Sequence, residues 1–534
     1  MSEEPIAVNC AVDAGAGLIP QYGLTLDARF GQSERATAHK FVRDICFSNL
    51  PLPFQKARTY FWLIVLTRVL GPSGFGAWSL FIVTLSAAMT VSTMNCGSSL
   101  MRFLSGKRKP VEVDEAISTV FAMVSGIAVA IGIALVCFSH PIGRLVFHSY
   151  RGSGMLLFAL GMALLFDSLF EEIKNLLRAR RENRPWAYLC LGRLVPETLA
   201  VIGVAYWLRG AAAATWTYAA IAMISVAGGA AYLRIRQGVR FVKPSRQVFS
   251  KYARYGLPLL PGVFASTLSL GADKYLVSYY LGLKEVGIYS VCFAISALVF
   301  FLTGPINDVL FPELSALYDQ HNYASFQSRF EGVQKFVLGF GVGVAALMSF
   351  FPHEILRVLA SPDFASGAST LAVLGVQGIF MAFVLLYVVI LNVRFRVWTT
   401  TLFWISSGVA IVVLDILFLP RVGVVGAAFS QLIATAGGAA ILVGMHWKLF
   451  RRTFRPAWLL QTGAAFMGVY LIAATWRASP SAGVASIGRI FAGACAFLLC
   501  LWLTRYVTGN EFQFLKEAIV TRETASAREL YSHT

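Results

Sequence analysis

The sequence predicts an all-α membrane protein with about fourteen transmembrane helices. Apolar types make up 57% of the 534 residues and charged types only 13%, whereas soluble globular domains carry about 25% charged residues. The apolar residues also fall into runs of about 20, the length of helix that crosses the hydrocarbon core of a bilayer. Lipid requires helices here, because each backbone polar group must be satisfied internally. This composition excludes a disordered chain, a nucleic-acid-binding domain and an ordinary soluble enzyme.

Each predicted helix is a stretch of about 20 mostly apolar residues. In chain order the fourteen stretches are 44–70, 76–101, 116–138, 154–173, 186–208, 213–233, 255–281, 287–316, 333–350, 369–393, 397–419, 423–446, 456–475 and 485–505.

Lys and Arg in the connections predict the orientation. With the N-terminus inside, the predicted cytoplasmic connections contain 24 Lys or Arg, and the opposite connections contain seven. Cytoplasmic loops of membrane proteins are rich in these residues, so we expect both termini to lie in the cytoplasm. The same rule accounts for the net charge of +18 without a nucleic-acid partner. The first forty residues contain no apolar region, so we expect no cleaved signal peptide.

Two parts of the chain match at a fixed offset of 211 residues. KFVR (40–43) aligns with KYAR (251–254), and LGPSGFGAWS (70–79) aligns with LGLKEVGIYS (281–290). Both matches bracket one predicted helix without a gap. Six helices per copy is an even number, so the two copies share one orientation. This is the parallel-repeat arrangement of many transporters, whose site lies between the two halves.

The repeat divides the chain into predicted domains. These are a cytoplasmic tail (1–40), an N-terminal six-helix bundle (41–238), a basic cytoplasmic linker (239–254), a C-terminal six-helix bundle (255–450), helices 13 and 14 (451–506) and a cytoplasmic C-terminal tail (507–534).

Four segments resemble the polysaccharide-transporter family, which includes Wzx-type O-antigen and exopolysaccharide flippases. They are LGPSGFGAWSLFIV (70–83), the block 255–296, FPELSALY (311–318) and VGVVGAAFSQLIATAGG (422–438). The resemblance covers roughly residues 40–450. It implies membership of the multidrug/oligosaccharidyl-lipid/polysaccharide exporter superfamily, with two six-helix bundles in a V around a central cavity.

The same resemblance implies a substrate and a location. The substrate would be an oligosaccharide on a polyprenyl diphosphate, usually undecaprenyl diphosphate. It would be flipped by alternating access across the bacterial inner membrane, for the synthesis of surface polysaccharide such as lipopolysaccharide or exopolysaccharide. A glycan polymerase and a chain-length regulator are possible partners besides the membrane lipids.

Cations inside the predicted helices are the candidate substrate site. A charge at the centre of a span costs about 2.5–3.5 kcal/mol on insertion scales, so it normally faces an aqueous cavity or a partner. Lys56 and Arg58 lie near the middle of the first predicted helix, and Lys274 lies late in the seventh. Cations there would bind a diphosphate. Lys56 and Arg58 cannot share one helix face. If the helix instead starts near Pro53, both lie at its inner end and reach the interface.

Acidic residues inside the helices have two interpretations. Asp273, Asp308 and Asp415 either couple transport to a proton or sodium ion, or have a structural role. Arg193 and Glu197 are four residues apart, so we expect an ion pair on one helix face. A further group is interpreted mainly as a solvated cytoplasmic helix end: Asp167, Glu171, Glu172 and Lys174.

The predicted function is a flippase and not an enzyme. The sequence contains no metal-ligand cluster, no phosphate-binding glycine loop and no CxxC among its eight cysteines, so we expect no cofactor and no metal. Two alternatives remain open. A cation-coupled multidrug exporter of the same superfamily would have an acidic or aromatic cavity. A non-transporting scaffold of a glycan assembly complex would tolerate neutralisation of its cavity cations.

Overall fold

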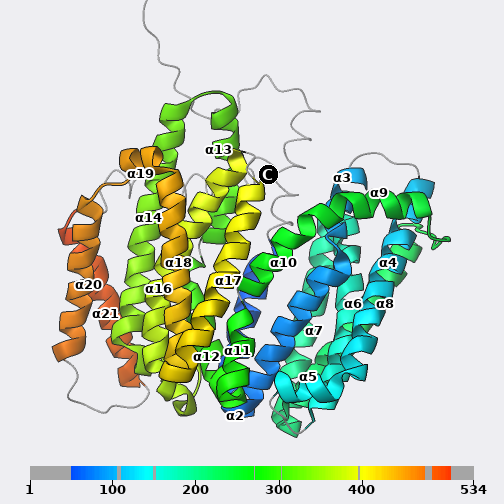
Figure 1. Cartoon of the computed structure of the whole chain (residues 1–534), viewed down its shortest axis with the longest axis horizontal. Coiled ribbons are helices and arrows are strands. Elements are labelled where there is room, and N and C mark those ends of the chain that lie inside the picture. Colours follow the sequence, from blue (N-terminus) through cyan, green and yellow to red (C-terminus); the bar gives the residue numbers. More distant parts are fainter. Residues whose placement is uncertain are drawn as a thin grey trace, which may run out of the picture.

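The computed structural model describes most of the chain as helix (Figure 1). The described residues are 50–104, 110–147, 152–269, 271–301, 303–394, 397–475 and 484–506. They contain no β-strand. The two predicted cytoplasmic tails, 1–40 and 507–534, lie outside the described residues. The predicted all-α fold class is therefore confirmed for the part of the chain that is described.

The first group of helices forms the right-hand bundle in Figure 1. Its members are α2 (Pro51–Thr93), α3 (Cys96–Leu104), α4 (Pro110–Cys137), α5 (Ser139–Leu145), α6 (Ser153–Ala179), α7 (Asn183–Leu208) and α8 (Ala211–Arg236). Pro51 and Pro110 are the first residues of their helices, where the missing N–H would have had no intrahelical partner. The connector α9 (Arg246–Gly256) and the 3₁₀ turn η1 (Leu257–Leu259) then lead to the second group.

The second group forms the left-hand bundle. Its members are α10 (Leu260–Ser269), α11 (Ala272–Leu281), α12 (Leu283–Ser296), η2 (Ala297–Phe300), α13 (Thr303–Asp319), α14 (Tyr323–Phe350), α15 (Pro352–Leu359), η3 (Pro362–Gly367), α16 (Ala368–Val393), α17 (Val397–Val422), α18 (Val424–Met445) and α19 (Trp447–Thr453). The last two helices are α20 (Ala457–Thr475) and α21 (Val484–Leu503), which pack together on the outer flank of this bundle, with α20 against α14 (Figure 1).

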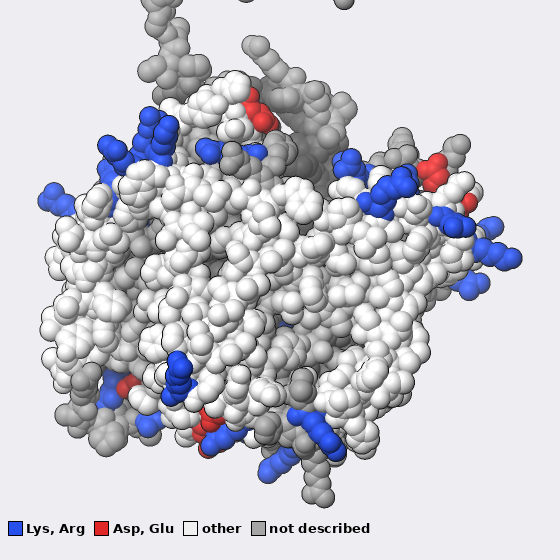
Figure 2. All heavy atoms as spheres, viewed as in Figure 1, with Lys and Arg blue, Asp and Glu red and all other residues white. Residues whose placement is uncertain are grey.

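The long helices run between two ends of the molecule. We call one the α9 end, where α3, α9 and α19 lie, and the other the α5 end (Figure 1). Figure 2 shows a wide, almost uncharged band between the two ends, with Lys and Arg along both edges. Such a band matches the hydrocarbon core of a bilayer, as expected for a multi-pass membrane protein.

The number of spans differs from the prediction. Twelve described helices are long and apolar enough to cross a membrane, or thirteen if the bent pair Arg246–Ser269 and Ala272–Leu281 is one span. The predicted count of fourteen spans is not confirmed. One reason for the difference is that α2 is counted as one span, although its two arms fold back on each other. The rings of Trp62 and Trp78 lie 5.4 Å apart, whereas 16 residues of straight helix would separate them by about 24 Å.

Two glycines make the equivalent turn in each bundle. Gly71 reverses α2 with φ 65° and ψ −179°, and Gly282, which follows it by 211 residues, separates α11 from α12 with φ 86° and ψ 175°. This backbone region is accessible essentially to glycine alone. The two turns therefore have the same conformation at the offset that the sequence repeat predicts.

The bundles meet at equivalent positions of the two copies. Gly76 of α2 and Gly287 of α12 are 211 residues apart, and a Cβ at Gly76 would lie 2.0 Å from the carbonyl oxygen of Leu283. One turn further along, the hydroxyl of Ser79 donates a 2.7 Å hydrogen bond to the hydroxyl of Ser290, which is again at the offset of 211. The helices therefore cross in direct backbone contact beside the local two-fold axis.

The hydrophobic core is shared by the bundles at one end only. One cluster of buried side chains contains residues of both, among them Phe81 and Tyr289. A second cluster, which includes Trp186, contains residues of the first bundle and α9 only. A third, which includes Tyr387, belongs entirely to the second bundle. The two halves are thus joined toward the α5 end and have separate cores toward the α9 end, which is the arrangement needed for a cavity between them.

Candidate functional site

A polar cavity lies beside the junction of the bundles. One part has a volume of about 200 Å³ and is lined by Gln55, Arg58, Met89, Asp167, Phe170, Glu171, Lys174, Cys190, Arg193, Leu194 and Tyr218. An adjoining part of about 170 Å³ adds Thr90, Thr93, Asn95, Leu260 and Val263. Met89 and Glu171 line both parts, so we call the two together the central cavity. Because Leu260 and Val263 belong to α10, side chains of both bundles contribute to it.

Five residues of the first bundle form a connected set on the cavity wall, which we call the Arg193 network. Arg58 of α2 donates to Glu197 at 2.5 Å, and Arg193 donates to the other oxygen of Glu197 at 2.6 Å. Arg193 also pairs with Asp167, which accepts a 2.6 Å hydrogen bond from the hydroxyl of Tyr218. Two guanidinium groups face two carboxylates, so the network is electrically balanced.

The predicted pair of Arg193 and Glu197 is present in the network, but it is not self-contained. Arg58 and Asp167 join it from two other helices. The interpretation of Asp167 as part of a solvated helix end is wrong. Its side chain is 4% exposed, because it lies twelve residues before the end of α6 at Ala179, a depth of about 18 Å.

Glu172 and Lys174 likewise differ from the solvated helix end that the sequence predicts. Glu172 is fully buried. Lys174 lines the central cavity and pairs with Glu171 at 2.6 Å. The position of Lys174 adds a cation to the cavity that sequence reasoning did not assign to the site.

The three predicted substrate cations lie in three different surroundings. Arg58 is part of the Arg193 network. Lys56 is exposed in the second turn of α2, with its Nζ 5.7 Å from the ring centroid of Phe301 in the second bundle. Lys274 is half-buried, and its Nζ lies 5.4 Å from the ring of Phe293. The described part of α2 begins at Pro51, so Lys56 lies in its second turn, and its predicted position near mid-depth of the membrane stays a prediction.

A second buried polar group, which we call the Asp273 cluster, lies in the second bundle. Asp273 of α11 is fully buried. Its carboxylate accepts hydrogen bonds from the hydroxyl of Tyr289 and, at 3.0 Å, from the amide of Gln431. Asp415 of α17 is also fully buried, lies within electrostatic range of Asp273, and has the neutral hydroxyl of Ser430 beside it.

The Asp273 cluster contains two acids without a salt bridge in the described part of the chain. Burial of a carboxylate without compensation is costly, so such groups normally take up a proton or a cation. The cluster is thus chemically able to hold one small positive species. No described group of three or more His, Cys, Asp or Glu is placed to hold a metal ion. The side chain of the third predicted acid, Asp308, lies outside the described residues.

A polar clasp joins the bundles near the α5 end. The guanidinium of Arg68 on α2 donates to the backbone carbonyl of Ala360 at 2.9 Å and to that of Val358 at 2.8 Å. Val358 lies in the last turn of α15, and Ala360 directly follows that helix. Together with the hydrogen bond of Ser79 to Ser290, these contacts close the molecule on this side.

Sequence reasoning missed Tyr218, Gln431 and Lys174. A signal existed for Gln431, which is a lone amide within an apolar run. None existed for Tyr218, because aromatic residues are common throughout this chain. The depth of Asp167 could have been found by counting back from the basic end of its helix.

Comparison with known proteins identifies one family. The sequence model of the family described as "Polysaccharide biosynthesis protein" matches residues 65–369, which is more than half of the chain. An uncharacterized membrane protein of Methanocaldococcus jannaschii is 27% identical over 188 residues, which are 35% of this chain and 37% of that protein. The chain therefore spans little more than a third of this relative in the match.

Solved structures share the fold. The lipid II flippase MurJ in an inward closed conformation superposes with a TM-score of 0.69 at 17% identity, covering 86% of this chain and 99% of MurJ. An inward-facing multidrug resistance MATE family transporter of the MOP superfamily gives 0.61 at 14% identity, covering 74% of this chain and 94% of that transporter. At these identities the likeness concerns the fold alone.

Proposed function

Because the chain belongs to the polysaccharide biosynthesis protein family, we propose that it is a flippase for a lipid-linked oligosaccharide. It moves a polyprenyl-diphosphate-linked repeat unit across the bacterial inner membrane, by alternating access, for surface polysaccharide synthesis. The observation that carries this proposal is the central cavity, where Arg58 and Lys174 lie between two bundles inside an apolar protein. Cations within the hydrocarbon region mark substrate pathways, and a diphosphate is a substrate group that they fit.

The orientation follows from the surface charge. We place the α9 end in the cytoplasm, because the basic connections between the spans lie there and cytoplasmic loops are rich in Lys and Arg. The bundles have separate cores toward this end and contact each other near the α5 end. This state therefore corresponds to one that is closed toward the periplasm.

Arg58 and Lys174 are the proposed principal contacts of the diphosphate. Arg58 donates to Glu197 through one Nη, and its side chain is still 26% exposed. The guanidinium therefore retains a donor for a phosphate oxygen. Lys56, exposed beside Phe301 of the other bundle, would meet the phosphate during entry. Lys274 is proposed as a later contact near the Asp273 cluster.

The Asp273 cluster is the proposed site of ion coupling. A proton or a sodium ion would compensate the two buried carboxylates of Asp273 and Asp415. Asp273 directly follows the break at which α10 and α11 bend by 43°. Uptake of a cation beside this break would change the favoured bend, and with it the position of the bundle. Asp308 remains a predicted contributor.

Complementation of a deletion strain tests this function. The gene is deleted in its host, and surface polysaccharide and lipid-linked oligosaccharide on the cytoplasmic side are measured. The strain then receives the wild type or the single alanine variants of Arg58, Lys174, Lys56 or Lys274 at matched protein levels. The control is Lys448→Ala, an exposed lysine of α19. We expect the deletion to abolish polysaccharide and to accumulate the lipid-linked unit, and the Arg58 and Lys174 variants to fail.

The outcomes separate the three functions. If the deletion leaves polysaccharide intact, the substrate is wrong, and a cation-coupled multidrug exporter is the better proposal. If the deletion matters but all four variants behave like Lys448→Ala, the cavity cations are not the site, as a non-transporting scaffold would require. Arg58→Lys keeps the charge but loses the planar fork, so its failure with normal protein yield would point to bidentate phosphate binding and not to misfolding.

A further inference from the structure

The connector α9 is held rigidly across the α9 end of the first bundle. The segment before it is fixed to α4 by three 2.9 Å hydrogen bonds, including those from the backbone N–H of Val242 to Ser118 and of Ser245 to Thr119. On α9 itself, the carbonyl of Tyr252 accepts a hydrogen bond from Ser99 at 3.2 Å. Gly256 lies against α2, where an added Cβ would meet the carbonyl oxygen of Met94 at 2.3 Å.

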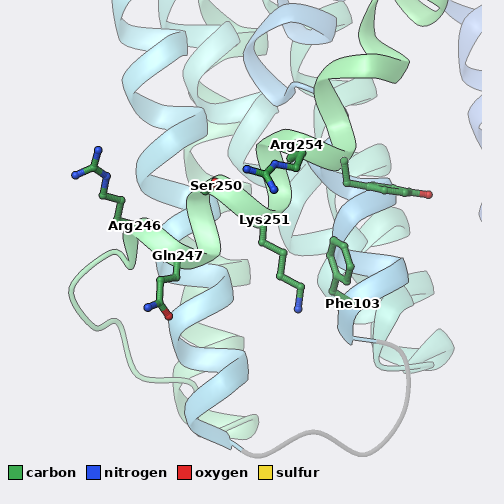
Figure 3. Close-up of a pocket in the computed structure, with 7 residues that line it drawn as sticks. Phe103, Arg246, Gln247, Ser250, Lys251 and Arg254 are labelled. Atoms are coloured by element: carbon green, nitrogen blue, oxygen red, sulfur yellow. The ribbon is translucent and has the colours of Figure 1, made fainter.

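One face of α9 lines an open pocket. Tyr252, Ala253 and Gly256 are buried on the face toward the bundle. The polar residues of the helix are turned to the other side and line a pocket of about 920 Å³ together with two aromatic residues: Phe103, Arg246, Gln247, Ser250, Lys251, Arg254 and Tyr255. We call this the α9 pocket. Figure 3 shows Lys251 extending from α9 alongside the ring of Phe103.

The α9 pocket is cationic and has no acidic lining. Arg246, Lys251 and Arg254 are exposed, and none of the three forms a salt bridge within the described residues. Lys251 Nζ lies 4.5 Å from the ring centroid of Phe103, a contact that orients the ammonium without neutralising it. The central cavity differs, because its cations are paired with carboxylates. The positive side chains beside these aromatic rings are therefore able to bind an anion.

An exposed apolar residue near the pocket indicates where the anion comes from. Leu257 of η1 follows the pocket residue Tyr255 by two positions and has an exposed fraction of 46%. Exposed apolar side chains next to Lys and Arg are typical of helices in the interface of a bilayer. The acyl chains of a lipid would cover this side chain, whereas a soluble anion would leave it in water.

We propose that the α9 pocket binds the phosphate of an anionic phospholipid from the surrounding leaflet, with the lipid chains against Leu257. Lys251 and Arg254, one turn apart on α9, contact the headgroup phosphate, Arg246 adds to the positive field, and Phe103 and Tyr255 form the wall of the pocket. This lipid is not the transported cargo, so the proposal does not depend on the flippase function. Because α9, η1 and α10 form the first arm of the bent pair, a bound lipid would fix the arm that ends just before α11, the helix of Asp273.

Native mass spectrometry of the full-length protein in detergent tests the site. The protein is mixed with phosphatidylglycerol or with zwitterionic phosphatidylcholine, and the bound lipid is measured. We expect selective retention of phosphatidylglycerol. The triple variant Arg246→Gln, Lys251→Gln, Arg254→Gln should bind it at least about tenfold more weakly, since each Lys or Arg near an anionic lipid surface contributes roughly 1 kcal/mol. Lys251→Gln alone should give an intermediate affinity.

A matched control removes the same charge outside the pocket. The variant Arg234→Gln, Arg236→Gln, Arg240→Gln loses three exposed arginines of the same surface that do not line the pocket. It should retain the lipid like the wild type. Equal losses in both triple variants would overturn the proposal in favour of unspecific surface charge, as would equal retention of the two lipids by the wild type.

Two competitors distinguish the source of the phosphate. Inorganic phosphate at equal concentration should not displace the bound phosphatidylglycerol, because it lacks acyl chains. A polyprenyl diphosphate at equal concentration should displace it no better than additional phosphatidylglycerol does. Preferential displacement by the polyprenyl diphosphate would assign the pocket to loading of the transported substrate and would overturn the proposal.

Discussion

The Arg193 network and the Asp273 cluster both bury two carboxylates, but they differ in charge balance. Asp167 and Glu197 face the guanidinium groups of two arginines. Asp273 and Asp415 have only neutral donors, and no salt bridge among the described residues. The first set is electrically balanced as it stands and joins four helices. We propose that a proton or a cation completes the second. Burial of an acid does not by itself indicate function, whereas burial without compensation does.

The largest expected loss of stability comes from a substitution that removes the charge balance of the Arg193 network. Arg193→Leu leaves Asp167 and Glu197 with Arg58 as the only cation, and removal of one partner of a buried pair costs about 3–5 kcal/mol. We expect a much lower unfolding temperature in detergent, measured by thermal unfolding. The double variant Arg193→Leu, Glu197→Leu removes one charge of each sign and should recover most of the loss. Equal destabilisation of the single and double variants would contradict the idea of a balanced network.

Asp415→Asn should have the opposite result: transport should fall, while the stability should not. Asp415 has no salt bridge within the described residues, and the amide oxygen of Asn still accepts from the Ser430 hydroxyl, so we expect the unfolding temperature to be unchanged or raised. Transport should fall by about tenfold or more, because the compensating ion is no longer taken up. Polysaccharide recovery in the deletion strain at matched protein level measures the second quantity. A variant that transports normally would show that the acid is structural.

Sodium should stabilise the protein through the Asp273 cluster and not through the Arg193 network. A ligand at ten times its dissociation constant adds about 1.4 kcal/mol to the stability of the folded state. Thermal unfolding is compared in sodium chloride and in choline chloride at equal ionic strength. We expect a stabilisation by sodium in the wild type and in the Arg193, Glu197 double variant, and none in Asp415→Asn. If Asp415→Asn responds to sodium like the wild type, the site of ion binding lies elsewhere.

The smallest expected losses of stability come from a Tyr-to-Phe substitution made once in the Arg193 network and once in the Asp273 cluster. Tyr218 donates to Asp167, and Tyr289 donates to Asp273. Replacing either by Phe removes one hydrogen bond, which costs about 1–2 kcal/mol of stability. Tyr218→Phe should leave the response to sodium unchanged, whereas Tyr289→Phe should shift the sodium concentration needed for stabilisation. Identical behaviour of the two variants would remove the distinction between the regions.

The fold was predictable because the properties that determine it are local. Hydropathy and length define the spans, and one pattern, LGxxxxGx followed by an aromatic residue and Ser, contains the glycines of both hairpin turns and of the backbone contact. Gly71 and Gly282 have the same conformation because both turns reverse the chain between two spans. The number of spans was less certain, since a reversal at a single glycine leaves no loop between helices.

The site was only partly predictable, because contacts between helices depend on rotations that the sequence does not state. Arg58 was identified as an intramembrane cation, but its pairing with Glu197 joins residues 139 positions apart. Asp273 and Asp415 were identified separately, and only the fold brings them together. Lys56 was expected near mid-depth, which stays a prediction, and only the fold shows that it lies beside Phe301 of the second bundle.

The contact of Gly76 with Gly287 has a consequence for which residues the two halves tolerate there. Each glycine lies against the backbone beside its own counterpart, as in a symmetric dimer of one six-helix unit. A side chain at either position would meet a backbone carbonyl of the opposite helix, so both positions require glycine for as long as the two helices keep this contact. At this place the two halves of the chain pack as two copies of one unit.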